Sequence, residues 1–187
     1  KDGARMSMKG SKFENILMSY FGRLNYNYKE TYLLNATLRA DGSSKFAPGN
    51  QWGYFPSVSG GWVVSNEEFL RDSKALNFFK IRASWGQVGN QSIRSFQYLA
   101  LVKSNTTNYS FGDEEGVLTP GSYLQNIANP NLKWETSEQI DLGFDARFLD
   151  NALSVNFDVY KKTNKDWLIL APILATAGAD APFINGG

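Results

Sequence analysis

The side chains that most often carry out chemistry in proteins are scarce in this sequence. The 187-residue chain has no cysteine and no histidine, which excludes thiolate ligands, cysteine nucleophiles and the commonest general base. Its 18 aspartates and glutamates are scattered, and their spacing picks out no pair that would act as acid and base. An enzyme would have to rely on carboxylates alone, so we expect no catalytic, cofactor-binding or metal site.

Three arginines are the first candidates for contact with a solute. Arg39, Arg82 and Arg147 fall in the middle of predicted strands, among polar neighbours. On a wet face they could touch a substrate. They could also be hydrated or pair with aspartates such as Asp141 and Asp145 on adjacent strands, and we favour this second interpretation.

Three tryptophans are the other candidates. Trp52, Trp134 and Trp167 could stack on sugar rings, or they could anchor strands at a membrane interface, as aromatic residues do in outer-membrane barrels. Interfacial anchoring is the interpretation we favour, because aromatic residues gather near predicted strand ends. The clearest clusters are Tyr26, Tyr28 and Tyr32 beside one turn and Trp52, Tyr54 and Phe55 beside a long loop.

Polar and apolar residues alternate along much of the chain, which places one set on each face of a β-strand. Between Met18 and Tyr28, for example, the even positions are mostly apolar and the odd positions mostly polar. Two further strands could lie between Ser95 and Leu124, where no clean alternation shows. The pattern predicts strands over residues 18–28, 32–41, 52–64, 79–86, 140–148 and 153–159.

The length of these segments favours an antiparallel transmembrane β-barrel. Several reach the roughly 9–11 residues that cross a bilayer at a tilt, whereas strands of soluble domains usually have about 5–6 residues. A soluble β-sandwich that binds carbohydrate or acts as an adhesin is the alternative, since it also has alternating strands. It does not readily explain arginines in mid-strand, which a water-filled lumen tolerates.

The predicted connections support the barrel, because outer-membrane barrels have short turns on one side and long loops on the other. Ser65 or Asn66 could cap a single helical turn in the medium link. The links are, in order, 29–31 (short), 41–51 (long), 65–77 (medium), 87–133 (very long), 149–152 (short) and the segment after Asn164 (long).

Charge and hydropathy exclude two other classes of protein. Lysines and arginines number 19 against 18 acidic residues, so nothing indicates a nucleic-acid partner. No run reaches the ~18 consecutive apolar residues that a transmembrane helix needs.

Three blocks of sequence resemble the SusC/RagA family of TonB-dependent outer-membrane transporters from Bacteroidetes, in family order and spacing. The tail YKKTNKDWL at 160–168 is also similar. We interpret the blocks as structural rather than ligand-binding, because they place turn residues at a strand exit and glycines within strands. They are LRADGSSKF at 38–46 with FPSVSGGW at 55–62, KIRASWGQVGN at 80–90, and NPNLKWE at 129–135 with QIDLGFD at 139–145.

The resemblance implies a barrel of about 22 strands filled by a plug, which imports glycans or peptides with energy from TonB. It also implies an outer-membrane location, contact with lipid and a SusD-like surface lipoprotein over the outer mouth. We expect residues 1–187 to be part of the barrel domain, about six strands of the wall. No plug or TonB-contacting segment is recognisable, so we expect the chain to be stable only beside the rest of its barrel.

Overall fold

The computed structural model describes residues 14–71, 73, 75–110 and 118–186, and their backbone is largely extended. None of the helical turns in this part of the chain is long and apolar enough to cross a membrane. The elements are β1 (Leu17–Tyr28), β2 (Tyr32–Ser43), β3 (Trp52–Val63), η1 (Val64–Asn66), β4 (Leu76–Asn90), β5 (Val102–Ser110), β6 (Leu118–Leu124), β7 (Glu135–Phe148), β8 (Leu153–Lys165), β9 (Trp167–Leu170), η2 (Ala175–Ala177) and β10 (Phe183–Gly186).

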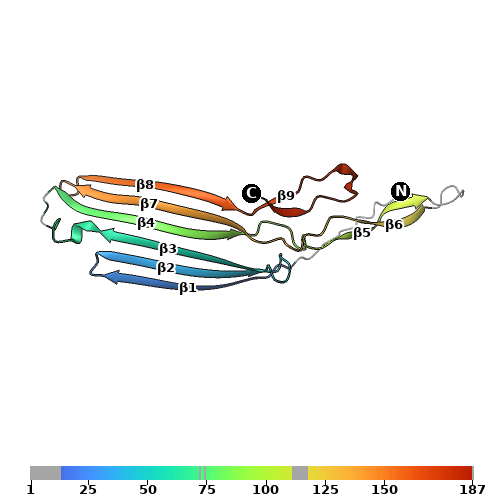
Figure 1. Ribbon diagram of the computed structural model, residues 1–187, viewed down its shortest axis with the longest axis horizontal. Helices are drawn as coiled ribbons and strands as arrows, with labels where there is room; N and C mark the ends of the chain where they lie inside the picture. The colour runs from blue at the N-terminus through green and yellow to red at the C-terminus, as the bar shows by residue number, and fades with distance from the viewer. Residues whose placement is uncertain (1–13, 72, 74, 111–117, 187) are drawn as a thin grey trace, which may run out of the picture.

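Six of the strands form one antiparallel sheet in the order β1-β2-β3-β4-β7-β8 (Figure 1). Between β4 and β7 the chain leaves the sheet and forms the β5–β6 hairpin, while β9 and β10 form a second hairpin. The predicted all-β antiparallel fold and its six strands are confirmed. The two further strands expected between Ser95 and Leu124 are β5 and β6.

Three strands extend well beyond the sequence prediction, whereas β1 and β2 extend beyond it by one or two residues. β4 covers 15 residues, β7 covers 14 and β8 covers 13. The added parts of β7 and β8 are polar on both faces, as in the run from Glu135 to Gln139. Alternation of hydrophobicity fades there, although the backbone ladder continues through Thr136 opposite Lys165.

Short and long connections fall at opposite ends of the sheet, as predicted. Figure 1 shows the turns β1–β2, β3–β4 and β7–β8 at one end and the long segments at the other. The β1–β2 turn contains Lys29 and Glu30 at φ 52° and 56°, the left-handed geometry that matches the twist of a hairpin. The predicted cap at Ser65 or Asn66 is wrong, because η1 begins after Val63 and no side chain caps it.

Strand register converts the alternation into two distinct faces. One row across all six strands is entirely polar, and an adjacent row is apolar. The polar row is Asn25, Asn35, Ser59, Ser84, Asp141 and Tyr160, and the apolar row is Tyr26, Leu34, Gly60, Ala83, Leu142 and Val159.

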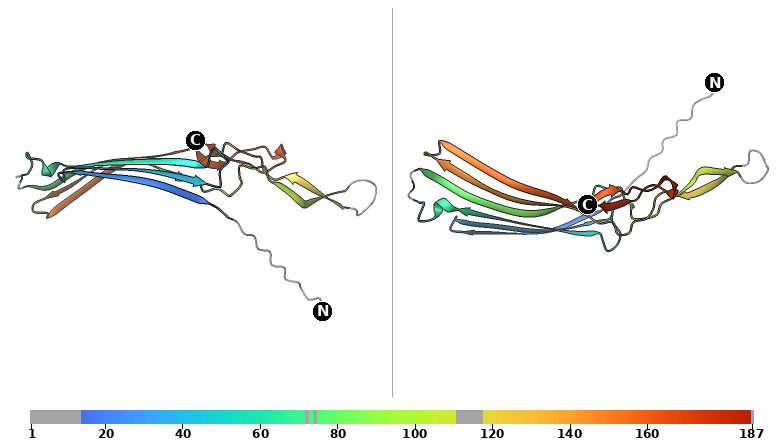
Figure 2. Two further views of the ribbon diagram at one scale, coloured as in Figure 1. Left: turned by 90° about the horizontal axis from the view of Figure 1, so that it is seen from below. Right: turned by 45° about the horizontal axis from the view of Figure 1, so that its top comes forward.

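The apolar face is open rather than covered. Leu24 is 64% exposed and Phe157 is 53% exposed, and among the described residues no second sheet packs over the six strands. The sheet is a single layer bowed along its length (Figure 2). A β-sandwich would bury these side chains, so the sandwich alternative is not favoured. A continuous apolar surface of this extent marks contact with a membrane or another partner.

A small hydrophobic core lies at the long-loop end of the sheet. It consists of Phe46, Phe55, Ile93, Leu132 and Trp134, each no more than 7% exposed. Phe46 and Phe55 belong to the first family block, and Leu132 and Trp134 belong to the third. Residues far apart in sequence therefore meet in one aromatic cluster that fixes the bases of the long loops.

Gly89, in the second block, shows how tightly this core is built. A Cβ atom at Gly89 would overlap the ring of Phe55, whereas a Cβ at Gly60 in β3 would meet nothing within 4 Å. We expect Gly89→Ala to lower the free energy of unfolding of the full-length protein by about 1–3 kcal/mol, the usual cost of overpacking. The matched variant Gly60→Ala changes it by less than about 0.5 kcal/mol.

Urea unfolding of the protein in lipid vesicles measures both values. Equal unfolding free energies for the two variants would contradict the close packing of Phe55 on Gly89.

Candidate functional site: the polar face of the sheet

The polar face carries a cavity of about 680 Å³ in the middle of the sheet. β1, β2, β3, β4, β7 and β8 all contribute to its lining. Most of the side chains there are amides, hydroxyls and charged groups, with Leu33, Leu34 and Ala83 among them, which suits a wet surface. The polar lining residues are Asn25, Asn27, Asn35, Ser59, Lys80, Arg82, Ser84, Asp141, Asp158 and Tyr160.

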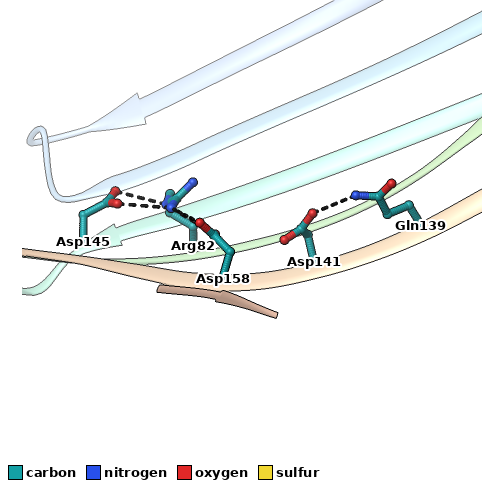
Figure 3. Close-up of polar contacts among 5 residues, drawn as sticks. All are labelled: Arg82, Gln139, Asp141, Asp145 and Asp158. Carbon is teal, nitrogen blue, oxygen red and sulfur yellow. Dashed lines mark hydrogen bonds and ion pairs between the residues drawn. The ribbon is translucent and has the colours of Figure 1, made fainter. Parts of the chain in front are cut away.

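Arg82 is held by carboxylates from two other strands (Figure 3). Its Nη2 donates to Asp145 Oδ1 on β7 at 3.1 Å, and its Nε lies 3.0 Å from Asp145 Oδ2 as an ion-pair contact. Nη2 also lies 3.0 Å from Asp158 Oδ1 on β8. The guanidinium thus links three strands, and its charge is offset within the face.

A glycine in β7 makes possible the contact between Arg82 on β4 and Asp158 on β8. In register, Arg82 stands opposite Gly143, which in turn stands opposite Asp158. A Cβ at Gly143 would overlap Asp158 Oδ1. The missing side chain leaves a gap over β7 through which Asp158 reaches Arg82.

The pairing of Arg82 corrects one detail of the sequence interpretation. Asp145 is a partner, as expected, but Asp141 is not. Asp141 accepts a hydrogen bond from Gln139 Nε2 at 2.9 Å instead (Figure 3), and Asp158 is the second partner of Arg82.

The other two arginines lie elsewhere on the polar face. Arg39 pairs with Asp41, two residues along β2, at 2.8 Å, and both line a separate cavity of about 190 Å³. Arg147 lies near the short-turn end, with its guanidinium carbon 5.2 Å from the ring centroid of Phe78, within the range of a cation–π contact.

The three tryptophans have three different environments. Trp52 belongs to the apolar face and stacks on Tyr20, with ring centroids 6.0 Å apart. Trp134 is 7% exposed in the core, and its Nε1 donates to the Gln51 carbonyl at 2.9 Å. Trp167 starts β9 and is 49% exposed. The six candidate residues are therefore not gathered into one site.

The sequence interpretation missed most of the residues that line the central cavity. Asp158, Tyr160 and the asparagines of β1 and β2 meet Arg82 only through the strand register. The available signal was the polar half of each alternating segment, because polar positions of paired strands must share a face.

A carboxylate outside the strands clamps two aromatic rings at the short-turn end. Glu67 Oε1 accepts hydrogen bonds from Tyr32 Oη at 2.7 Å and Trp62 Nε1 at 3.1 Å, and the two rings stack. The hydrogen bond from Tyr32, followed by that from Trp62, lowers the pKa of Glu67 below its ordinary value. Both donors stabilise the charged form.

Comparison with protein families identifies this architecture. The model of the TonB dependent receptor-like β-barrel matches residues 7–187. The TonB-dependent receptor SusC of Bacteroides thetaiotaomicron is 40% identical over 158 residues, 82% of this chain and 15% of that protein. TonB-dependent receptor P3 of Formosa agariphila is 38% identical over 188 residues, all of this chain and 18% of that protein. The chain thus spans less than a fifth of these relatives.

Solved structures of outer-membrane receptors and transporters superpose on this chain. The RagAB peptide transporter superposes with a TM-score of 0.78 at 30% identity, over 91% of this chain and 18% of that chain. The siderophore receptor PirA from Acinetobacter baumannii superposes with a TM-score of 0.58 at 15% identity, over 92% of this chain and 24% of that chain. At that identity PirA supports the fold alone.

The Arg82 link yields a stability prediction. Arg82→Gln leaves Asp145 and Asp158 facing each other without a cation, so we expect the free energy of unfolding of the full-length protein to fall by about 1 kcal/mol, the scale of a half-exposed ion pair. Lys162→Gln, an exposed cation of the same face in β8, is the matched control and has a smaller effect. Urea unfolding in vesicles compares them, and equal losses would contradict the three-strand link.

The Glu67 clamp yields a pH prediction. Because the folded state lowers the pKa of Glu67, the clamp adds stability above the unfolded-state pKa and loses it as pH falls through the lowered folded-state value. Carboxyl ¹³C chemical shifts of the full-length protein measure the titration. Glu67→Gln removes this acidic-side loss of stability, and Glu68→Gln, an exposed neighbour, retains it. An unshifted Glu67 titration would refute the clamp.

Proposed function

This chain belongs to the TonB-dependent receptor β-barrel family, and we propose that it forms part of the wall of a TonB-driven outer-membrane importer. The observation that carries the proposal is the family match over residues 7–187, together with 40% identity to SusC. Members of the family are transporters and receptors of the bacterial outer membrane. Transport is therefore proposed in preference to catalysis.

The edges of the sheet support a place in a larger barrel. β1 and β8 each have one sheet partner among the described strands, so their outer edges carry unpaired backbone groups. Each such group costs several kcal/mol in hydrocarbon. Residues 1–187 are proposed to be a section of the barrel domain whose neighbouring strands and plug belong to the remainder of a longer protein.

The two faces of the sheet support its orientation. The exposed apolar face fits the outer-membrane lipid, and the polar face fits a water-filled interior. Solute or plug would then meet Arg39, Arg82 and Arg147 from the interior. Of the tryptophans, Trp167 is exposed at the long-loop end, Trp52 faces outward with the apolar side chains, and Trp134 is buried, so support for solute contact is greatest for Trp167.

The cargo and partners follow from the relatives and are proposed at the level of class. SusC and the RagAB peptide transporter are both similar to this chain, so glycans and peptides are the two candidate cargoes. The resemblance to SusC and RagA also supports a SusD-like surface lipoprotein at the long-loop end. TonB would act through a segment outside residues 1–187.

Uptake by cells tests the proposal. Cells that carry the full-length protein take up a dilute glycan or peptide mixture, and deletion of its gene reduces uptake of at least one component about ten-fold or more, because passive diffusion through pores does not replace energy-driven import of dilute solutes. Loss of TonB has the same effect. Uptake of a small sugar that diffuses through porins is the control and stays unchanged. Gene-dependent uptake that persists without TonB would overturn the importer mechanism.

A further inference from the structure

A second cavity lies outside the sheet, where three segments of the long-loop end come together. Its volume is about 420 Å³, within the range of about 300–1,000 Å³ typical of small-ligand sites. The segments are those that precede β5, follow β6 and join β9 to β10. Its polar lining is Arg94, Gln97, Gln125, Asn126 and Asp180.

The floor of this cavity is built from backbone and one buried amide. Asn126 is 6% exposed; its Nδ2 donates to the Leu99 carbonyl at 2.9 Å, and its Oδ1 accepts from the Leu101 amide at 3.1 Å. The Asp180 amide donates to the Gln125 carbonyl at 2.7 Å. These bonds join the three segments, so the cavity is formed before any ligand arrives.

The other polar side chains that line the cavity, in contrast, have no bonded partner among the described residues. Within the part of the chain that the structure describes, no hydrogen bond or ion pair engages the side chains of Arg94, Gln97, Gln125 or Asp180. The central cavity of the sheet differs, because Arg82, Asp158 and Asp141 there satisfy one another or nearby groups. Arg94 and Asp180 are exposed and Gln97 and Gln125 are partly exposed, so all four side chains are free to meet a ligand. A few polar groups placed around a cavity are typical of a small-ligand site.

A strained residue stands next to this cavity. Phe96 has a φ of 63°, a conformation that is a clear outlier for a bulky side chain. Such strain clusters at functional sites. The turn that contains Phe96 presents Gln97 to the cavity.

The chemistry of the lining selects the ligand. One cation and one anion suit a molecule that carries both charges, and carboxamides pair well with peptide groups. Sugars lack the charges and bind best on exposed aromatic faces, whereas the ring that lines this cavity, Phe183, packs against the core. A metal ion is a poor fit, since Arg94 would repel it and no cluster of three acidic groups occurs among the described residues.

We propose that this cavity binds short peptides with free ends, with Asp180 on the α-ammonium group and Arg94 on the α-carboxylate. The volume of about 420 Å³ suits a small ligand. Gln97 and Gln125 are placed to pair with its peptide groups. The inference rests on the proposed importer and narrows its cargo from two classes to one.

Calorimetric titration of the full-length protein in detergent with tri-alanine tests the site, because recognition of the ends needs no particular side chain. We expect N-acetylation of tri-alanine to weaken binding to the wild-type protein about ten-fold, the effect of losing one charge-assisted hydrogen bond. In Asp180→Asn, acetylation has no further effect. C-terminal amidation of tri-alanine likewise weakens binding to the wild-type protein about ten-fold. In Arg94→Gln, amidation has no further effect.

Glu68→Gln and Arg71→Gln are matched controls, since both residues are exposed at the opposite end of the sheet, and they leave binding unchanged. Because the ligand is altered as well as the protein, a variant that fails to fold does not block the test. Binding of maltotriose in place of tri-alanine, absence of tri-alanine binding, or end-group effects that persist in both variants would each overturn the peptide site. The importer proposal stands or falls separately, on TonB-dependent uptake.

Discussion

Backbone hydrogen bonding is the constraint on which the rest of this structure depends. A strand in hydrocarbon has no water to satisfy its N–H and C=O groups, so each strand must be flanked on both sides. The four inner strands β2, β3, β4 and β7 are paired on both sides, and the ladders reach 12 positions between β1 and β2 and 13 between β7 and β8. Among the described strands, β1 and β8 are each paired on one side. Everything else follows from this pairing, because register decides which side chains become neighbours.

Register separates the environments that a membrane wall requires. In the middle of the sheet, apolar rows with large exposed side chains occupy one face, and the opposite face carries Arg82, whose charge is offset by Asp145 and Asp158. Towards the long-loop end, Glu138 and Lys165 form an ion pair on the apolar face. Gly143 shows that a missing side chain can be as important as a present one, since it gives Asp158 room to reach across β7. At the short-turn end, Glu67 ties Tyr32 to Trp62 just beyond the strands.

The long-loop end is organised by packing rather than by pairing alone. Phe46, Phe55, Leu132 and Trp134 form a core that joins the strand exits to the loops, and Asn50 Nδ2 adds a hydrogen bond to the Pro130 carbonyl at 3.1 Å. Family blocks that are separated in sequence therefore cooperate in one structural task. With the loop bases held in this way, the peptide cavity near Arg94 and Asp180 has a defined shape.

The sequence alone was sufficient for the fold class, the six sheet strands, the order of short and long connections and the family, because a period of two is a local property and turn residues mark its limits. It could not show that Trp134 is buried, that Arg82 bridges to Asp158, or that residues 94, 125 and 180 border one cavity. These features depend on which strand lies beside which, and on loops whose side chains have no periodicity. Tertiary structure decided them, because register and packing bring together residues that are far apart in the chain. Their spacing in the sequence does not predict that they are in contact.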